Sequence, residues 1–169
     1  MNYTYETLTL HLLISYRLID DHILNLQLWD TAGQEKYRTL TRMYYRDAKA
    51  ALIFYDITDR RTFEDKIKEW IEDVRSKSTE DVSIIIVGNK IDMEDKREVS
   101  TDEGREFAER LGIPFFEVSA KDGTCLNELF TTVGKVVLEK NPKMFDETES
   151  DQDLVTLDDR PVKKKSGCC

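Results

Sequence analysis

The chain has 169 residues, of which 40% are hydrophobic, and its formal net charge is −9 at pH 7. This length fits one domain, and the composition is sufficient for a packed interior. The acidic balance excludes nucleic-acid binding through the main body, because neutralising phosphates needs clustered lysine and arginine. Three cysteines, two of them the last two residues, make no disulfide framework and indicate a reducing, cytosolic environment.

Two extended segments come first along the chain. Residues Ile23–Leu28 alternate apolar and polar side chains, as a strand with one buried face does. The preceding segment, Leu8–Ile19, leads into Asp20-Asp21, a pair typical of a turn. We therefore predict a β-hairpin.

Three later segments have the composition of buried strands. Ala50–Tyr55 and Val82–Val87 are nearly continuous apolar runs, and Pro114–Val118 is a shorter run of the same kind. Strands of a parallel sheet look like this when helices cover both faces.

Helical patterns lie between these runs. Phe63–Val74 has apolar residues at the spacing of one buried stripe. Ser100 and Glu103 form a capping box ahead of the next helix, which Gly112 ends, and Leu126–Leu138 supplies the last helix. Alternating strands and helices predict an α/β fold, mostly a parallel sheet flanked by helices. We expect residues 1–140 to form the domain and residues 141–169 a flexible tail.

The first cluster with chemical meaning is Asp30-Thr31-Ala32-Gly33-Gln34-Glu35, directly after the alternating strand. Asp30 in this place can hold Mg²⁺ through a water beside a nucleotide's phosphates. Gly33 lets the backbone approach a terminal phosphate, and Gln34 can orient an attacking water. An isolated Asp-x-x-Gly is more often a turn, but the matched run after a strand favours the phosphate site.

The second and third clusters follow the next strands. Asn89-Lys90-Ile91-Asp92 places a carboxylate where it can accept paired hydrogen bonds from guanine, and Lys90 can lay its stem over the base. Ser119-Ala120-Lys121 can present a backbone N–H to the base carbonyl. Each cluster alone fits a solvated turn. Three of them in order, each at a strand end, indicate a nucleotide site.

These motifs resemble those of the Rab branch of the Ras superfamily over Leu18–Lys140. Further segments of the same resemblance are Leu26–Trp29, Lys36–Thr41, Tyr44–Ala48 and Tyr55–Thr58. The resemblance implies GTP or GDP with Mg²⁺, and GTP hydrolysis in vesicle traffic. It implies that Gln34 positions the hydrolytic water. It also implies that Asn89 and Asp92 read guanine, with Ala120 and Lys121 completing the base pocket.

The beginning of the chain departs from that family. The family opens with a strand, a GxxxxGK[ST] phosphate loop and a helix, and these 169 residues match none of the three. Thr7 falls where the family's switch I threonine binds Mg²⁺, but Leu8–Leu12 replaces Ile-Gly-Val-Asp-Phe. We therefore expect an incomplete P-loop NTPase, a Ras-like G domain missing its central first strand and only marginally stable.

The terminal Cys168-Cys169 resembles the double-cysteine ending on which Rab proteins carry two prenyl groups. Two lipids are what stable anchoring requires, and Lys163–Lys165 adds attraction to anionic lipid. The alternative is an ordinary pair of thiols. With the lipids, the resemblance implies the cytosolic face of an endomembrane and, as partners, Rab escort protein, GDP-dissociation inhibitor and effectors.

Three readings of function stay open at this point. The first is a monomeric GTP-binding switch of vesicle traffic, seen through an incomplete gene sequence. The second is a pseudo-GTPase, an interaction module that keeps switch II (Gln34–Arg46) and the lipid tail. The third is an unstable fragment without function.

Overall fold

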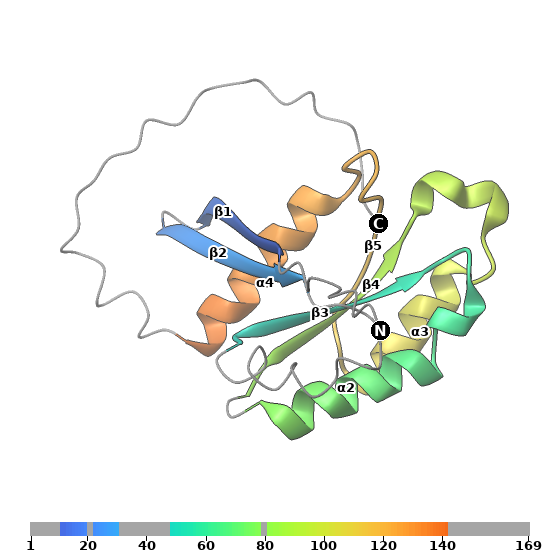
Figure 1. The fold of residues 1–169 in the computed structure, drawn as a ribbon, viewed down its shortest axis with the longest axis horizontal. Helices are drawn as coiled ribbons and strands as arrows, with labels where there is room; N and C mark the ends of the chain where they lie inside the picture. The colour runs from blue at the N-terminus through green and yellow to red at the C-terminus, as the bar shows by residue number, and fades with distance from the viewer. Residues whose placement is uncertain (1–10, 20–21, 31–47, 79–80, 142–169) are drawn as a thin grey trace, which may run out of the picture.

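The structure is a computed structural model that describes residues 11–19, 22–30, 48–78 and 81–141. It alternates strands and helices along the chain (Figure 1). In order, the elements are β1 (His11–Ile19), β2 (His22–Asp30), β3 (Ala50–Asp56), the 3₁₀ helix η2 (Arg60–Thr62), α2 (Asp65–Lys77), β4 (Ser83–Asn89), the 3₁₀ helix η3 (Ile91–Lys96), α3 (Thr101–Leu111), β5 (Phe115–Val118) and α4 (Leu126–Lys140).

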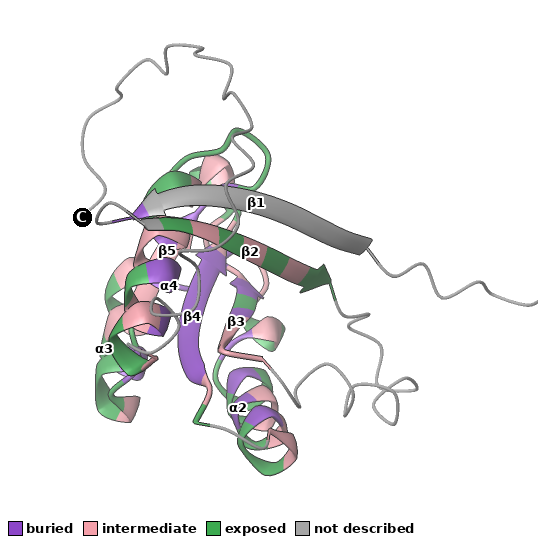
Figure 2. Ribbon diagram, turned by 90° about the vertical axis from the view of Figure 1, so that its left-hand side faces the viewer, coloured by how far each residue is buried: buried purple, intermediate pink, exposed green. Residues whose placement is uncertain are grey.

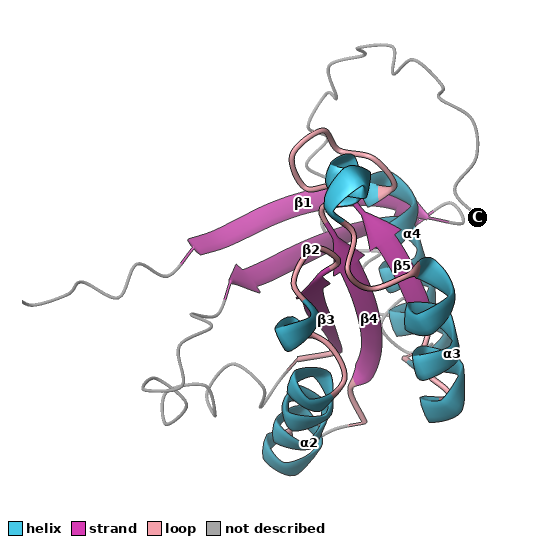
Figure 3. Cartoon of the chain, turned by 90° about the vertical axis from the view of Figure 1, so that its right-hand side faces the viewer, coloured by secondary structure: helices cyan, strands magenta, loops and turns pink. Residues whose placement is uncertain are grey.

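The described strands form two sheets. β1 and β2 pair antiparallel, with Ile19 opposite His22, which confirms the predicted hairpin. β3, β4 and β5 form a parallel sheet in the order β3-β4-β5. The predicted α/β fold with a mostly parallel sheet is therefore confirmed, and the hairpin crosses the strands of that sheet (Figure 3).

Helices cover the parallel sheet on both faces around β4 (Figure 2). Ile84 and Ile86 point into a core shared with α2 and α3, whereas Ile85 and Val87 point into a second core shared with α4. Successive side chains of a strand face opposite sides, so a strand that is covered on both faces consists mostly of apolar residues. This double burial explains the unbroken apolar run of β4.

β3 differs from β4 on one face. Ile53 and Tyr55 are buried against α2 and α3, but the Phe54 side chain is 46% exposed. The prediction that this run is buried on both faces is therefore wrong at Phe54. The second core is built mainly from β4, β5 and α4, and on β3 it reaches only Ala50 and Leu52, which are partly buried.

The hairpin packs against the last helix. A Cβ atom placed on Gly134 of α4 would lie 2.1 Å from Ile19 Cδ1 and 3.0 Å from Leu24 Cδ1, so a larger residue there would require the end of the Ile19 side chain to move. Leu24, Leu26 and Leu28 are half-buried, while Trp29 on the alternate face is 48% exposed. Among the described residues, no ladder joins β2 to β3. The absence of a central strand between them stays a prediction.

The helix boundaries show local capping. Ser100 and Glu103 form the predicted capping box of α3, and Gly112 ends that helix in the left-handed conformation at φ 64°. α2 begins at Asp65, two residues later than the periodicity predicts, because Phe63 is extended and closes η2. Phe63 is nonetheless buried, and Trp70 of α2 packs partly buried against the same core. Of the helices that the structure describes, none is long and apolar enough to cross a bilayer.

Gly104 in the middle of α3 gives the first prediction. In a helix interior, alanine is normally more stable than glycine by about 1 kcal/mol. Here its Cβ would lie 2.5 Å from Tyr55 Oη and 2.7 Å from Phe115 Cζ. Such overpacking costs about 1–3 kcal/mol. We expect Gly104→Ala to lower the free energy of unfolding in urea, while the exposed Glu106→Ala on the same helix changes it by less than about 0.5 kcal/mol. A stabilised Gly104→Ala variant would contradict this packing.

Candidate functional site

The carboxyl ends of three parallel strands meet at one edge of the sheet. β3 ends at Asp56, β4 ends at Asn89, and β5 ends at Val118, directly before Ser119. Open α/β sheets place their ligand sites outside these ends. The second and third predicted clusters therefore lie side by side, as their positions in the sequence suggested.

Asn89 joins the two loops. Its Oδ1 accepts hydrogen bonds from the backbone N–H groups of Lys90 at 2.8 Å and Ala120 at 3.0 Å. Its backbone carbonyl also accepts from the Ile57 N–H at 3.1 Å, which ties in the loop after β3. The Ala120 N–H, one of the backbone donors of the third cluster, thus already has a partner within the protein.

Asp92 is the carboxylate that faces the neighbouring loop. Its Oδ1 accepts from Ser119 Oγ at 2.9 Å, and its Oδ2 lies 3.3 Å from Lys121 Nζ. The hydrogen bond from Ser119, followed by those from Lys121, holds the pKa of Asp92 below its usual range. Asp92 is therefore a fixed, ionised acceptor. The side chain of Lys121 is 81% exposed, so it can swing away and leave Oδ2 open.

Ser119 is the support under this carboxylate. It is fully buried, and its Oγ also accepts from the Asp122 N–H at 3.3 Å. Its backbone N–H donates to the Thr124 carbonyl at 3.1 Å. The residue therefore fixes both the third loop and the orientation of Asp92.

Lys90 has a partner that the sequence reasoning missed. Its Nζ forms an ion pair with Asp56 Oδ2, and hydrogen bonding to Asp56 raises the pKa of Lys90. Asp56 Oδ1 accepts from the Thr58 N–H at 2.9 Å and its hydroxyl at 2.7 Å. Partial burial opposes ionisation of Asp56, but the hydrogen bonds from Lys90 and Thr58 outweigh it and lower the pKa. The sequence signal that could have identified this partner is the acidic residue at the end of β3, which lies at the same edge of the sheet as Lys90.

The backbone at Lys90 is in the left-handed region, with φ 75° and ψ 34°. This conformation is uncommon for residues other than glycine and marks a turn that surrounding contacts enforce. Here the hydrogen bond to Asn89 and the ion pair with Asp56 hold it. This turn directs the chain away from the end of β4, so that Asp92 lies beside Ser119.

The predicted phosphate-side residues are not brought to this cluster by the described structure. Asp30 is exposed at the end of β2, in the other sheet, and among the described residues no hydrogen bond or ion pair joins it to Asp92. The part of the chain that the structure describes contains no group of three residues able to hold a metal ion. Thr7, Gly33, Gln34, Cys168 and Cys169 lie outside the described residues.

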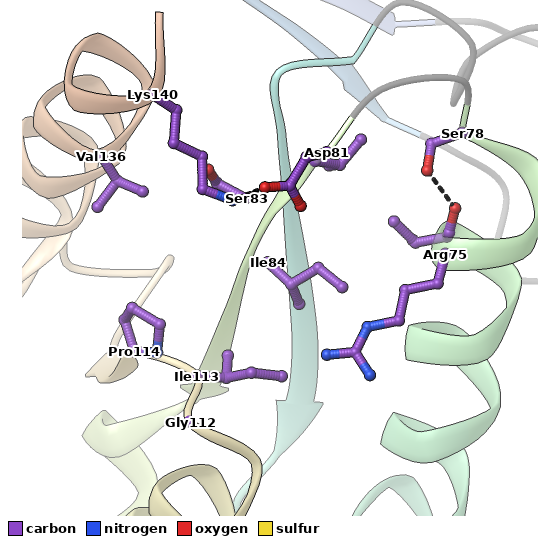
Figure 4. Close-up of a pocket in the computed structure, with 12 residues that line it drawn as sticks. Arg75, Ser78, Asp81, Ser83, Ile84, Gly112, Ile113, Pro114, Val136 and Lys140 are labelled. Atoms are coloured by element: carbon purple, nitrogen blue, oxygen red, sulfur yellow. Dashed lines mark hydrogen bonds and ion pairs between the residues drawn. The ribbon is translucent and has the colours of Figure 1, made fainter.

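A pocket of about 350 Å³ lies at the opposite end of β4 (Figure 4). Ser83, the first residue of β4, forms part of its wall, and the Lys140–Asp81 ion pair at 2.9 Å borders it. Because Asn89 ends the same strand, this pocket takes no part in the cluster described above.

The sequence profile of the Ras family matches residues 2–139. The chain belongs to the Ras family. It is 48% identical over 122 residues to the Ras-related protein Rab-2B of Dictyostelium discoideum, covering 72% of this chain and 60% of that protein. It is 40% identical over 154 residues to the GTP-binding protein ypt2 of Schizosaccharomyces pombe, covering 89% of this chain and 74% of that protein.

A third relative is the Ras-related protein SEC4 of Saccharomyces cerevisiae, 49% identical over 115 residues that cover 68% of this chain and 53% of that protein. The resemblance to Rab-like Ras-family GTPases and the Ras-like G-domain fold are thereby confirmed. The chain spans less than two thirds of the length of Rab-2B and of SEC4.

The contact between Ser119 and Asp92 gives the second prediction. Removing the hydroxyl with Ser119→Ala takes away the first cause of the lowered Asp92 pKa, so that pKa should rise toward its ordinary value. A lowered pKa stabilises the folded state above the unfolded pKa, and that stability is lost as pH falls through the folded pKa. The loss begins near the unfolded pKa in both proteins, but in the variant it should be smaller and should be complete at a higher pH. NMR titration of the Asp92 carboxyl carbon measures the change.

Lys121→Met provides the matched control. It removes the exposed partner on Oδ2 and keeps Ser119. The Asp92 pKa should therefore rise less in this variant than in Ser119→Ala. Equal shifts in the two variants would contradict the leading role given to Ser119.

Proposed function

We propose that this chain carries the guanine-reading part of a Rab-like small GTPase that acts in vesicular membrane traffic. The observation that carries the proposal is the pairing of Asp92 with Ser119 beside the Asn89–Ala120 hydrogen bond. Ras-family proteins bind GTP and GDP with Mg²⁺, and one relative is named as a GTP-binding protein. The described residues offer the base-reading half of such a site.

Guanine recognition follows from the acceptor character of Asp92. Each carboxylate oxygen can accept two hydrogen bonds, so Oδ1 retains one acceptor position beside Ser119. Guanine supplies two donors, N1–H and the exocyclic amine, whereas adenine has no proton on N1. Binding a base that leaves an acceptor unpaired costs about 1–3 kcal/mol relative to binding a base that pairs with it, and the cost is higher when the acceptor is a carboxylate. Lys90, already held by Asp56, lies beside this acceptor with its aliphatic stem available to the base.

The phosphate side of the proposal rests on the sequence. Gln34 would orient the hydrolytic water, Gly33 would admit the terminal phosphate, and Asp30 would hold Mg²⁺ through a water with Thr7 as a further ligand. These 169 residues contain no GxxxxGK[ST], whose amides and lysine neutralise the phosphates. We therefore propose that this chain alone holds GTP weakly. A surviving role would then be that of an interaction module built on switch II.

The third prediction concerns base choice. GDP should displace a fluorescent guanosine nucleotide from the chain better than ADP does, because Asp92 offers acceptors and no donor. Asp92→Asn replaces one acceptor oxygen by a donor amide and should remove this preference, lowering it by about tenfold or more. Competition titrations monitored by fluorescence measure both effects.

Asp95→Asn is the matched control, since it makes the same change on an exposed residue of η3 and should leave the preference unchanged. Equal competition by GDP and ADP in the unaltered chain would refute guanine reading. Submicromolar GTP binding with Mg²⁺ in a calorimeter would refute the proposed weakness of phosphate binding.

The proposal extends to the membrane through Cys168 and Cys169. As prenylated cysteines they would anchor the protein on the cytosolic face of an endomembrane, with Rab escort protein and GDP-dissociation inhibitor as carriers and effectors bound at switch II. Two lipid chains give stable anchoring where one gives only marginal binding.

The fourth prediction tests that anchor. Cys168→Ser combined with Cys169→Ser should move the protein from the membrane fraction to the soluble fraction of cells, because the attachment points of both lipids are gone. Cell fractionation with mass spectrometry of the C-terminal peptide measures location and modification together. Ser166→Ala, a change in the same tail that keeps both terminal cysteines, is the control and should leave the distribution unchanged. Membrane association that persists in the double variant would show that something other than lipid holds the protein there.

A further inference from the structure

Arg97 and Glu117 form an ion pair at the root of the two base-reading loops. Arg97 Nη1 lies 2.7 Å from Glu117 Oε1, and Arg97 Nη2 donates to Glu117 Oε2 at 3.2 Å. Both side chains are only 14% exposed. Planar, two-point pairing of this kind fixes the relative orientation of the two groups as well as their distance.

Each member of the pair has a second attachment. Arg97 Nη1 also donates to the Val99 carbonyl at 3.0 Å, just before α3. Glu117 Oε2 accepts from Thr101 Oγ1 at 2.9 Å, in the first turn of that helix. Arg97 is therefore tied to the segment just before α3 and Glu117 to the helix itself, and α3 is anchored in the core through Phe107.

The position of the pair in the chain connects it to the site. Arg97 directly follows η3, the short helix that contains Asp92. Glu117 lies in β5 two residues before Ser119. The same two segments also meet at the Asp92–Ser119 contact. They are therefore joined at two places, once by the ion pair and once by the base-reading carboxylate.

We infer that Arg97 and Glu117 are positioning residues for guanine recognition, acting through the register that they impose between η3 and the loop after β5. This inference rests on the proposed function. A shift between the two segments would tilt Asp92 on Ser119 and spoil the simultaneous contact of its two oxygens with the base. Base discrimination, and not only folding, then depends on a pair that touches no nucleotide.

The test compares GDP with IDP, whose base lacks the exocyclic amine and so reports on the second contact of Asp92. Glu117→Gln keeps the shape and removes the charge. We expect it to reduce the preference for GDP over IDP on the order of tenfold. Glu94→Gln is the matched control, because Glu94 binds the same guanidinium from the exposed side at 2.9 Å and leaves the pair with Glu117 intact. Its preference should equal that of the unaltered chain.

Two further variants separate positioning from stability. Ile71→Val weakens the core on α2, away from the loops, and should lower stability without changing the preference. Thr101→Val removes only the hydroxyl that supports Glu117 and should shift the preference in the same direction as Glu117→Gln, by less. It replaces Glu117→Gln if that variant does not fold.

A second readout needs no nucleotide. Hydrogen exchange at the Ala120 and Asp122 amides reports on their bonds to Asn89 and Ser119, and it should quicken in Glu117→Gln but not in Glu94→Gln. An unchanged GDP preference together with unchanged exchange in a folded Glu117→Gln would overturn the inference. If the unaltered chain does not distinguish GDP from IDP, the proposed function fails, and the exchange rates alone decide whether the pair positions the loops.

Discussion

The parallel pairing of β4 with both of its neighbours is the constraint on which the rest of this structure depends. It aligns Asp56 with Asn89 at one end of the β3–β4 ladder and Asn89 with Val118 on the β4–β5 ladder. Loops that are far apart in the sequence therefore start from one edge. The two cores on either side of β4 make this register costly to change, since a slip of one residue would exchange its two buried faces.

Charged groups at that edge are arranged in pairs, although the chain as a whole is strongly acidic. Lys90 with Asp56, Lys121 with Asp92 and Arg97 with Glu117 each join residues from different segments. The pairs differ in burial, and the difference separates their roles. The Arg97–Glu117 pair is largely buried and holds its two segments together. The side chain of Lys121 is exposed, so it can move away from Asp92 when a ligand binds. Exposed ion pairs contribute little to the free energy of unfolding. The contribution of Lys121 is therefore to balance the negative charge of Asp92, not to stabilise the fold.

Much of this architecture could be predicted from local sequence patterns. The apolar runs predicted β3, β4 and β5, and Ser100 with Glu103 predicted the start of α3, because periodicity and capping are properties of neighbouring residues. The clusters Asn89–Asp92 and Ser119–Lys121 were placed at strand ends for the same reason, as each directly follows a strand, and their role in reading a base stays a proposal.

What could not be predicted depends on the tertiary arrangement. Phe63 fits the apolar stripe of α2, yet its backbone is extended because η2 closes just before it. The exposure of Phe54 depends on how far α4 reaches across the sheet, which no pattern within β3 records. The partners Asp56–Lys90 and Arg97–Glu117 are separated by dozens of residues or by an intervening helix, so only the fold identifies them.

The two tryptophans sit in different parts of this architecture, with an optical consequence. Trp29 belongs to the hairpin and is about half exposed to water, while Trp70 lies partly buried on α2 against the parallel-sheet core. Their indole emission should therefore differ in wavelength and in access to a soluble quencher. Replacing either one by phenylalanine would leave a single reporter for each sheet. Melting curves recorded from the two reporters would coincide if hairpin and parallel sheet unfold as one cooperative unit, and would separate if they do not.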